Sequence, residues 1–450
     1  MKKDMKKELL TKSPLALMFQ LSIPAILGMI VIGLYPLMDG IFAGNIIGQT
    51  AMTACGVALP LTFFNTGTST LLGVGSASIL SRAMGKGDQE TMDKIMGNLI
   101  YWVILFSTII TFGVILLAPY FLDLVGAEGE IKTLGVRYLR ILFLGSIFVN
   151  FAQAANMVMR GEGLMKRAMS IMALGAVINI VLDPILMTVM GDYAIEGAAI
   201  ATVIAQVVQA IITLHYFKQK SEYVKIGKVR REKDISKEMF SVGVSAMTMQ
   251  IFLMIQQTIL YKQAFQYGGE NAGILMAATL RVYAFSFIPL WGMSQGLQPV
   301  VGANFGAKQY RRVKQAMKVF SVGGLVLAAL FWLPAQLLTT PILSAFNVAP
   351  SIITEGANNF RIFFSVFMLY GIMVMSITFF QAIGDGKKAG TIVMLRQLIL
   401  FIPAMVFLPK LFGANAVWWA EPVVDFIMIT VGVIMQVKAL STMERVGSQV

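Results

Sequence analysis

The chain has 450 residues, of which 57% are hydrophobic and 13% are charged, and its formal net charge at pH 7 is +13. A soluble domain carries about 25% charged residues, so this composition excludes an ordinary soluble protein and indicates an integral membrane protein. With one cysteine, Cys55, and one histidine, His215, the chain can form neither an intrachain disulfide nor a metal site built from several thiolates or imidazoles.

Twelve apolar segments follow one another along the chain, each long enough at about 20 residues to cross a bilayer as a helix. We therefore predict an all-α integral membrane protein with twelve transmembrane helices. No small-residue cleavage site follows the basic N-terminus, so we expect no cleavable signal peptide. The predicted spans are residues 15–43, 52–78, 96–118, 134–158, 168–190, 194–217, 237–261, 272–298, 315–338, 358–382, 390–409 and 413–437.

The basic residues are distributed unevenly between the two sides of this topology. Both termini and every second connection together hold 28 Lys and Arg, whereas the alternate connections hold three, Lys132, Lys262 and Lys410. By the positive-inside rule, this asymmetry predicts a multi-pass protein of the cell membrane with both termini in the cytoplasm. The net charge therefore reflects topology, and we expect the lipid bilayer rather than nucleic acid as its partner.

The two halves of the sequence repeat, with residues 81–96 resembling residues 302–317 at an offset of 221. Each half has six spans in the same orientation, which predicts two six-helix bundles related by a pseudo-two-fold axis along the membrane normal. The expected division is an N-terminal bundle (1–217), a cytoplasmic linker (218–236) and a C-terminal bundle (237–450). Further aligned pairs are 138–143 with 359–364 at 221, 160–166 with 383–389 at 223, and 197–201 with 418–422 at 221.

Four of the 23 acidic residues lie well inside predicted spans: Asp39, Asp183, Glu421 and Asp425. A charged side chain at the centre of a membrane helix costs roughly 2.5–3.5 kcal/mol on insertion scales, so such residues are candidates for function.

Asp183 is the acid with the clearest polar surroundings. It follows Asn179 by four residues and so shares a helix face with it, and Pro184 leaves the carbonyl of Ile180 without its backbone donor. This cluster predicts a site for a proton or for Na⁺. We expect no other metal ion in the protein. The alternative is a kink in which Asp183 caps loose backbone groups.

The first span carries Asp39 three residues after Pro36, and Pro24 lies nearer its start. Together with Pro184, these prolines are candidate hinges. The alternative for Asp39 is a position at the outer membrane interface, since it comes late in the span.

Glu421 and Asp425 share one face of the twelfth span, and Arg281 in the eighth span lies at a similar distance from the outer end of its helix. We predict a buried ion pair between Arg281 and these acids, with a structural or gating role.

Other polar residues recur on single faces of the fourth and sixth spans, where they indicate either a cavity wall or hydrogen bonds between helices. Tyr138, Gln153 and Asn156 form the first stripe, and Thr202, Gln206 and Gln209 form the second. Candidate substrate contacts elsewhere are Tyr35, Gln250, Gln256, Trp291 and Met293.

Four motifs together resemble the multidrug and toxic compound extrusion (MATE) family, closest to its DinF-like or MepA-like bacterial branch. They are MDGIFAGNIIG (38–48), GVGSASILSRAMGKGD (73–88), NIVLDPIL (179–186) and GAAIAT (197–202). The resemblance covers nearly the whole chain. It implies two bundles around a central cavity and cation-coupled export of organic, often cationic, compounds. It also implies that Asp39 acts with Asp183, and that these two acids line the N-terminal cavity together with Tyr138, Gln153, Asn156, Asn179 and Thr202.

The sequence therefore predicts an H⁺- or Na⁺-coupled antiporter for small organic molecules that needs no further cofactor and works as a monomer. Some family branches place an acid in the seventh helix; its absence here argues against coupling at that position. A lipid-linked saccharide flippase would be expected to have a strongly cationic cavity, whereas the deep C-terminal arginines number three, Arg281, Arg361 and Arg396. A membrane-embedded enzyme is disfavoured by the lack of a nucleophile motif, and a channel by the asymmetric placement of the acids.

Overall fold

The computed structural model describes residues 5–124, 129–221, 223–345 and 348–447. Within these ranges some side chains lie outside the description, including those of Tyr35, Pro36 and Asp39. The expectations for these three residues therefore fall outside the described residues.

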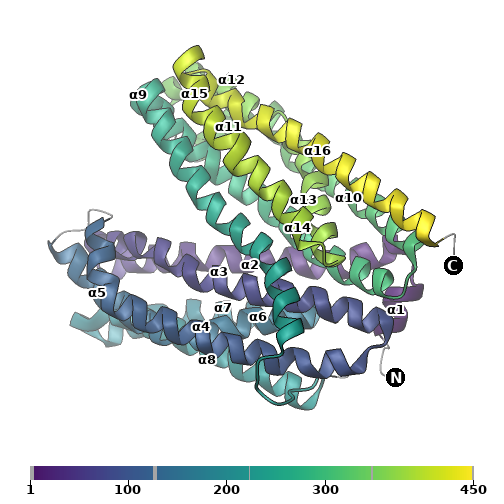
Figure 1. The fold of residues 1–450 in the computed structure, drawn as a ribbon. Coiled ribbons are helices and arrows are strands. Elements are labelled where there is room, and N and C mark those ends of the chain that lie inside the picture. Colours follow the sequence, from purple (N-terminus) through teal and green to yellow (C-terminus); the bar gives the residue numbers. More distant parts are fainter. Residues whose placement is uncertain (1–4, 125–128, 222, 346–347, 448–450) are drawn as a thin grey trace. The chain divides into compact units, whose positions relative to one another are not determined.

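The described part of the chain is helical throughout and contains no strand (Figure 1). The first half contains α1 (Met5–Thr11), α2 (Pro14–Ile46), α3 (Gln49–Lys86), α4 (Gln89–Leu124), α5 (Gly129–Leu144), α6 (Ser146–Gly161), α7 (Met165–Val189), the short 3₁₀ helix η1 (Gly191–Tyr193) and α8 (Ala194–Gln219). The second half contains α9 (Lys233–Gly306), α10 (Tyr310–Leu337), α11 (Thr339–Ala345), α12 (Pro350–Phe364), α13 (Phe367–Ala382), α14 (Gly386–Met394), the π-helix η2 (Leu395–Phe401), α15 (Ile402–Phe412) and α16 (Ala416–Gly447).

These elements make up the twelve expected membrane spans, and the all-α, twelve-helix fold class is confirmed. Ten segments are long and apolar enough to cross a membrane, and α5 with α6 forms an eleventh, bent by 54°. Two of the ten come from α9, which turns at Gly269, where φ is 69°. The twelfth span is α3, which has 38 residues. It is rich in Gly, Ser and Thr and is buried throughout residues 67–84, as befits a central helix against which others pack closely.

Left-handed turn residues fix the register of the internal repeat. Gly87 (φ 76°) corresponds to Lys308 (φ 59°), and Gly163 (φ 80°) corresponds to Gly384 (φ 84°), both at an offset of 221. The expected offset of 223 for residues 160–166 is therefore wrong by two residues. Sequence similarity misaligned this turn because glycines alternate in both copies.

Beyond this turn the offset becomes 222. The helices α8 and α16 begin at Ala194 and Ala416, so the expected offset of 221 for residues 197–201 is wrong by one. The additional residue lies between Gly384 and Ala416, the interval that contains η2. Because a π-turn holds one more residue than an α-turn, η2 accounts for the insertion.

The helices pack into two compact units whose boundaries lie inside helices α2 and α9. The amino-terminal unit is Leu27–Gly243, and the carboxy-terminal unit contains the described residues up to Ile26 and from Val244 onward. The Asn304 side chain donates a hydrogen bond to the carbonyl of Leu9 at 3.0 Å, which ties α1 to the second half of the chain. Conversely, the indole of Trp102 donates to Ser236 at 2.9 Å, so the start of α9 packs with the first half.

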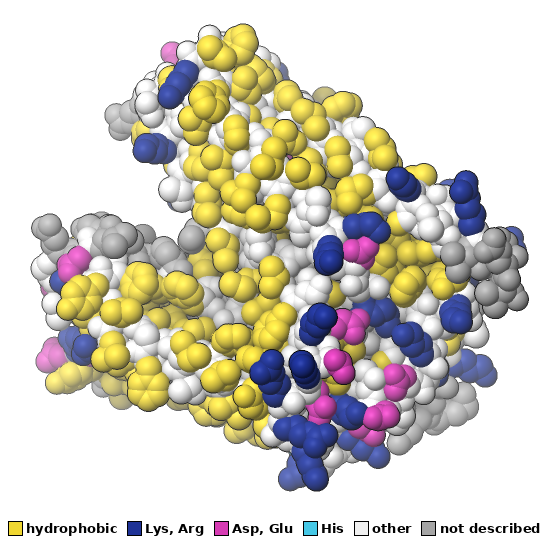
Figure 2. All heavy atoms as spheres, viewed as in Figure 1, with side chains coloured by type: hydrophobic (Ala, Val, Ile, Leu, Met, Phe, Trp, Pro, Cys, Tyr) yellow, Lys and Arg dark blue, Asp and Glu magenta, His cyan; other side chains and the backbone are white. Residues whose placement is uncertain are grey.

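Each unit has its own apolar core. In the amino-terminal unit, Leu139, Leu142 and Phe143 pack with α3, α4 and α8. In the carboxy-terminal unit, Phe360, Phe364 and Trp418 lie in an aromatic-rich core. Apolar side chains also cover much of the exposed helix surface in Figure 2, as expected for helices that face lipid.

Candidate functional site

Asp183, Asn179 and Thr202 form a buried polar cluster where α7 packs against α8. Their exposed fractions are 0%, 1% and 3%. The amide nitrogen of Asn179 donates to Asp183 Oδ1 at 3.0 Å and to Thr202 Oγ1 at 3.1 Å. The other amide atom, Asn179 Oδ1, is buried and has no hydrogen-bond partner among the described residues. The structure thus brings together a carboxylate, an amide and a hydroxyl, with one oxygen available to a ligand.

Pro184 lies inside α7, which continues to Val189. The carbonyl of Pro184 accepts a hydrogen bond from Thr188 Oγ1 at 2.7 Å. The helix therefore accommodates the proline without ending.

A cavity opens beside this cluster within the amino-terminal unit. Three of the expected lining residues, Gln153, Asn179 and Thr202, border it, and Gln206 contributes a buried Oε1 with no partner among the described residues. The remaining wall consists of Ile32, Val149, Met172, Gly175, Ala176, Ala205 and Gln209. The cavity thus combines an apolar wall with amide and hydroxyl groups, the arrangement typical of small-molecule sites.

Three expected lining residues, Tyr138, Asn156 and Asp183, do not border this cavity, and Asp183 lies behind Asn179 and Thr202. Tyr138 lies in the apolar core of the amino-terminal unit. The side chain of Asn156 donates to the carbonyl of Ala168 at 2.7 Å, so it links α6 to α7, the alternative that the sequence left open.

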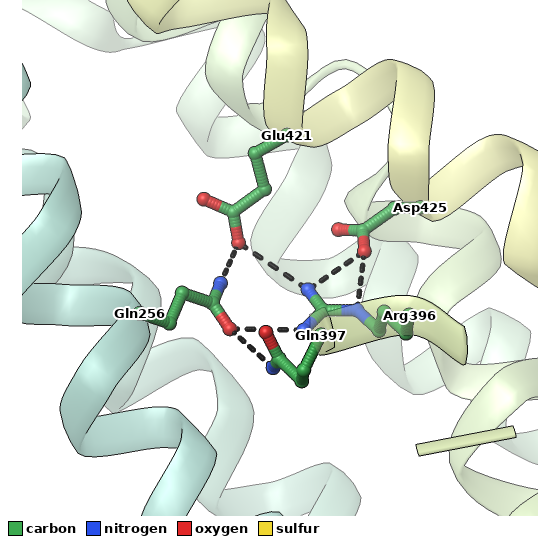
Figure 3. Close-up of polar contacts among 5 residues, drawn as sticks. All are labelled: Gln256, Arg396, Gln397, Glu421 and Asp425. Carbon is green, nitrogen blue, oxygen red and sulfur yellow. Dashed lines mark hydrogen bonds and ion pairs between the residues drawn. The ribbon is translucent and has the colours of Figure 1, made fainter. Parts of the chain in front are cut away.

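A second buried polar cluster lies in the carboxy-terminal unit and centres on Arg396 (Figure 3). Its Nε and Nη2 both contact Asp425 Oδ1 at 2.7 Å, and Nη2 lies 3.4 Å from Glu421 Oε1. Its Nη1 donates to Gln256 Oε1 at 2.9 Å, and Gln397 Nε2 donates to the same oxygen at 2.8 Å. Gln256 Nε2 in turn donates to Glu421 Oε1. We call these five residues the Arg396 cluster.

The expected pairing of Arg281 with Glu421 and Asp425 is wrong, because Arg396 occupies that place and Arg281 is exposed. The distance of a residue from its helix end gives depth but not the direction in which the side chain points, and Arg281 points outward. The sequence places Arg396 among the deep arginines but does not indicate its partner.

The other residues considered for substrate contact are dispersed. Gln256 is committed to the Arg396 cluster, Met293 is buried, and Gln250 and Trp291 are half-buried. The candidate hinge Pro24 is half-buried within α2, two residues before the boundary between the units.

Among the described residues, no three His, Cys, Asp or Glu side chains come together as a metal site. A Na⁺ ion at Asp183 would therefore draw on neutral oxygens, such as Asn179 Oδ1, as its further ligands.

Comparison with known proteins relates this architecture to one family of transporters. The family model MatE matches residues 24–185 and 241–407, one range in each half. The multidrug export protein MepA of Staphylococcus saprophyticus is 26% identical over 407 residues, which cover 90% of this chain and 89% of that protein. A crystal structure of MATE in the bent conformation superposes with a TM-score of 0.92 at 25% identity, covering 98% of this chain and 99% of that one.

An outward-facing multidrug resistance MATE transporter of the MOP superfamily superposes with a TM-score of 0.90 at 26% identity, covering 98% of this chain and 99% of that one. The family match spans more than half of the sequence, and the likeness in fold extends over nearly all of it. The resemblance seen in the motifs is thus confirmed: the chain is a membrane transporter, not an enzyme, and belongs to the MatE family.

Proposed function

We propose that this chain is a multidrug exporter that exchanges organic, often cationic, compounds for an inward-moving proton or Na⁺. The observation that carries the proposal is Asp183, a fully buried carboxylate held by Asn179 beside a cavity that combines apolar, amide and hydroxyl groups in a membrane-spanning unit. The export activity named for the MepA relative supports the same conclusion.

The coupling follows from the energetics of a buried charge. An ionised Asp183 is stabilised by the Asn179 amide but remains costly in an apolar bundle, so binding of a cation that neutralises it is favoured. Antiport requires that two conformations bind this cation with different affinity. We propose that Asp39 shares the cation with Asp183, and that α2 bends at Pro24 or Pro36 as the cation binds.

The test is efflux of a fluorescent organic cation from everted vesicles under an imposed pH gradient or Na⁺ gradient. We expect Asp183→Asn to abolish export while the purified protein elutes and melts like wild type. Asp192→Asn, at an exposed position in η1, is the matched control and should export normally. Wild-type rates in Asp183→Asn would overturn the proposal, and the gradient that drives wild-type efflux identifies the cation.

A lipid-linked saccharide flippase is the second candidate, and the cavity disfavours it. A pyrophosphate group calls for clustered Lys and Arg, whereas the described lining of the cavity consists of amides, one hydroxyl and apolar side chains.

We further propose that the transporter works as a monomer in the cell membrane with both termini in the cytoplasm. The distribution of Lys and Arg, 28 against three, supports this orientation.

A further inference from the structure

The Arg396 cluster contains more negative than positive charge. It holds two carboxylates, Glu421 and Asp425, against one guanidinium, and the three side chains are 2%, 5% and 4% exposed. The titratable groups that face it from neighbouring elements are phenols. Tyr370 lies under Arg396, with its ring centre 5.6 Å from Cζ, and Tyr283 packs on Tyr370 at 6.2 Å. If both acids were ionised, the described side chains would leave one uncompensated negative charge inside the helix bundle.

The two carboxylates are not held equally. Asp425 Oδ1 receives both Nε and Nη2 of Arg396 at 2.7 Å, whereas Glu421 lies 3.4 Å from Nη2. A charge-assisted hydrogen bond is short, so the guanidinium mainly stabilises an ionised Asp425. The guanidinium therefore stabilises an ionised Glu421 less than an ionised Asp425.

The two carboxylate oxygens of Glu421 differ in their hydrogen bonding. Oε1 accepts from Gln256, whereas Oε2 is buried and has no hydrogen-bond partner among the described residues. In Figure 3, one oxygen of Glu421 points toward Gln256 and the other points away from the labelled side chains. A buried carboxylate oxygen without a donor is strongly destabilised, and a proton on that oxygen removes the charge while Oε1 still accepts from Gln256.

From this arrangement we infer that Glu421 is a second proton-binding site of the transporter, located in the carboxy-terminal unit. A proton binds to Oε2, the carboxylate becomes a carboxylic acid, and the net charge of the cluster goes from −1 to zero without electron transfer. Arg396 positions the site by holding Asp425 ionised. The inference rests on the proposed function only in assigning this proton to transport, because proton binding itself can be measured without a substrate.

A proton suits this site better than Na⁺. The guanidinium lies 3.4 Å from the same carboxylate and repels a second cation, and one unpartnered oxygen cannot supply the several ligands that a hard cation takes.

Infrared spectroscopy of the purified protein tests the assignment, because a protonated carboxyl group absorbs apart from a carboxylate. We expect a protonated carboxyl band that shifts when glutamate is labelled with ¹³C and disappears in Glu421→Gln. Glu196→Gln is the matched control. Glu196 is also buried and its Oε2 has no partner among the described residues, but its single charge is balanced by one arginine, Arg137, so this variant should leave the labelled band intact. A labelled band that survives in Glu421→Gln would overturn the inference.

Isotope labelling of wild-type protein keeps the test valid if Glu421→Gln does not fold. A band that never responds to labelled glutamate would also overturn the inference, as would a band that Na⁺ removes at constant pH. In Asp183→Asn the glutamate band should persist. Its persistence there together with normal export would refute the coupling role of Asp183 and leave the second site standing, so the two proposals fail separately.

Discussion

In the amino-terminal unit, Asp183 is held by an amide beside a cavity, whereas in the carboxy-terminal unit Glu421 and Asp425 are held by Arg396 in a packed interior. The first arrangement borders a cavity with room for a ligand. The second is buried among hydrogen-bonded side chains of the Arg396 cluster. The same six-helix plan therefore supports two kinds of buried carboxylate. One is buried behind the side chains of Asn179 and Thr202, which border the cavity, and the other is compensated mainly by side chains of the protein.

The repeat shows how the difference arises. Arg396 corresponds to Gly175, which borders the cavity of the amino-terminal unit. A Cβ atom at Gly175 would lie 1.9 Å from Nε2 of Gln209, so a side chain at that position would require Gln209 to move. Similarly, Glu421 corresponds to Ala199 and Thr202 to Val424. Each of these polar residues thus has a glycine or an apolar residue at the equivalent position of the other half.

The largest expected effect comes from Arg396→Gln, which removes the positive charge that compensates the buried acids of the carboxy-terminal unit. Removing one partner of a buried charge pair costs about 3–5 kcal/mol, because the remaining charge stays buried. We expect a large fall in melting temperature in detergent. Arg281→Gln, at the exposed arginine of the same unit, should melt like wild type. Equal melting of the two variants would mean that the Arg396 cluster does not stabilise the protein.

Asn179→Ala and Asn156→Ala separate a ligand-facing amide from a structural one. Both remove a buried hydrogen-bonding group and should cost about 1–3 kcal/mol in unfolding free energy. We expect Asn179→Ala also to weaken the dependence of efflux on the cation gradient, since Asn179 holds Asp183, whereas Asn156→Ala should retain it. A cation dependence altered equally in both variants would place Asn156 in the site as well.

The smallest effect is expected for Thr202→Val, which removes one of the two acceptors of the Asn179 amide. The loss of one hydrogen bond is worth about 0.5–1.5 kcal/mol. A double-mutant cycle with Asn179→Ala measures the coupling in thermal unfolding. Additive effects would show that the bond contributes nothing to the cluster.

Much of the fold could be predicted because long apolar segments and basic connections are strong signals of membrane helices. The signal was weaker for α3, whose Gly, Ser and Thr content reflects burial against other helices. The π-helix η2 could not be predicted, since its residues, LRQLILF, look like an ordinary apolar helix. The register of the repeat after Gly384 was wrong for the same reason.

At the candidate site, contacts within one helix were predictable and contacts between helices were not. Asn179 and Asp183 are four residues apart, so helix geometry alone puts them on one face. The choice between Arg281 and Arg396 depends on how each helix is rotated about its axis. Likewise, the sequence pattern could not decide whether Asn156 faced a cavity or a neighbouring backbone carbonyl.

The π-helix η2 has a consequence for the history of the chain. If the halves descend from one duplicated ancestor, a single inserted codon is taken up inside the π-turn, so the residues that follow keep the facing of their counterparts at the new offset. In an unbroken α-helix the same insertion would have turned every later side chain by about 100°. The second half could therefore gain a residue beside Arg396 without rotating the end of that helix within its bundle.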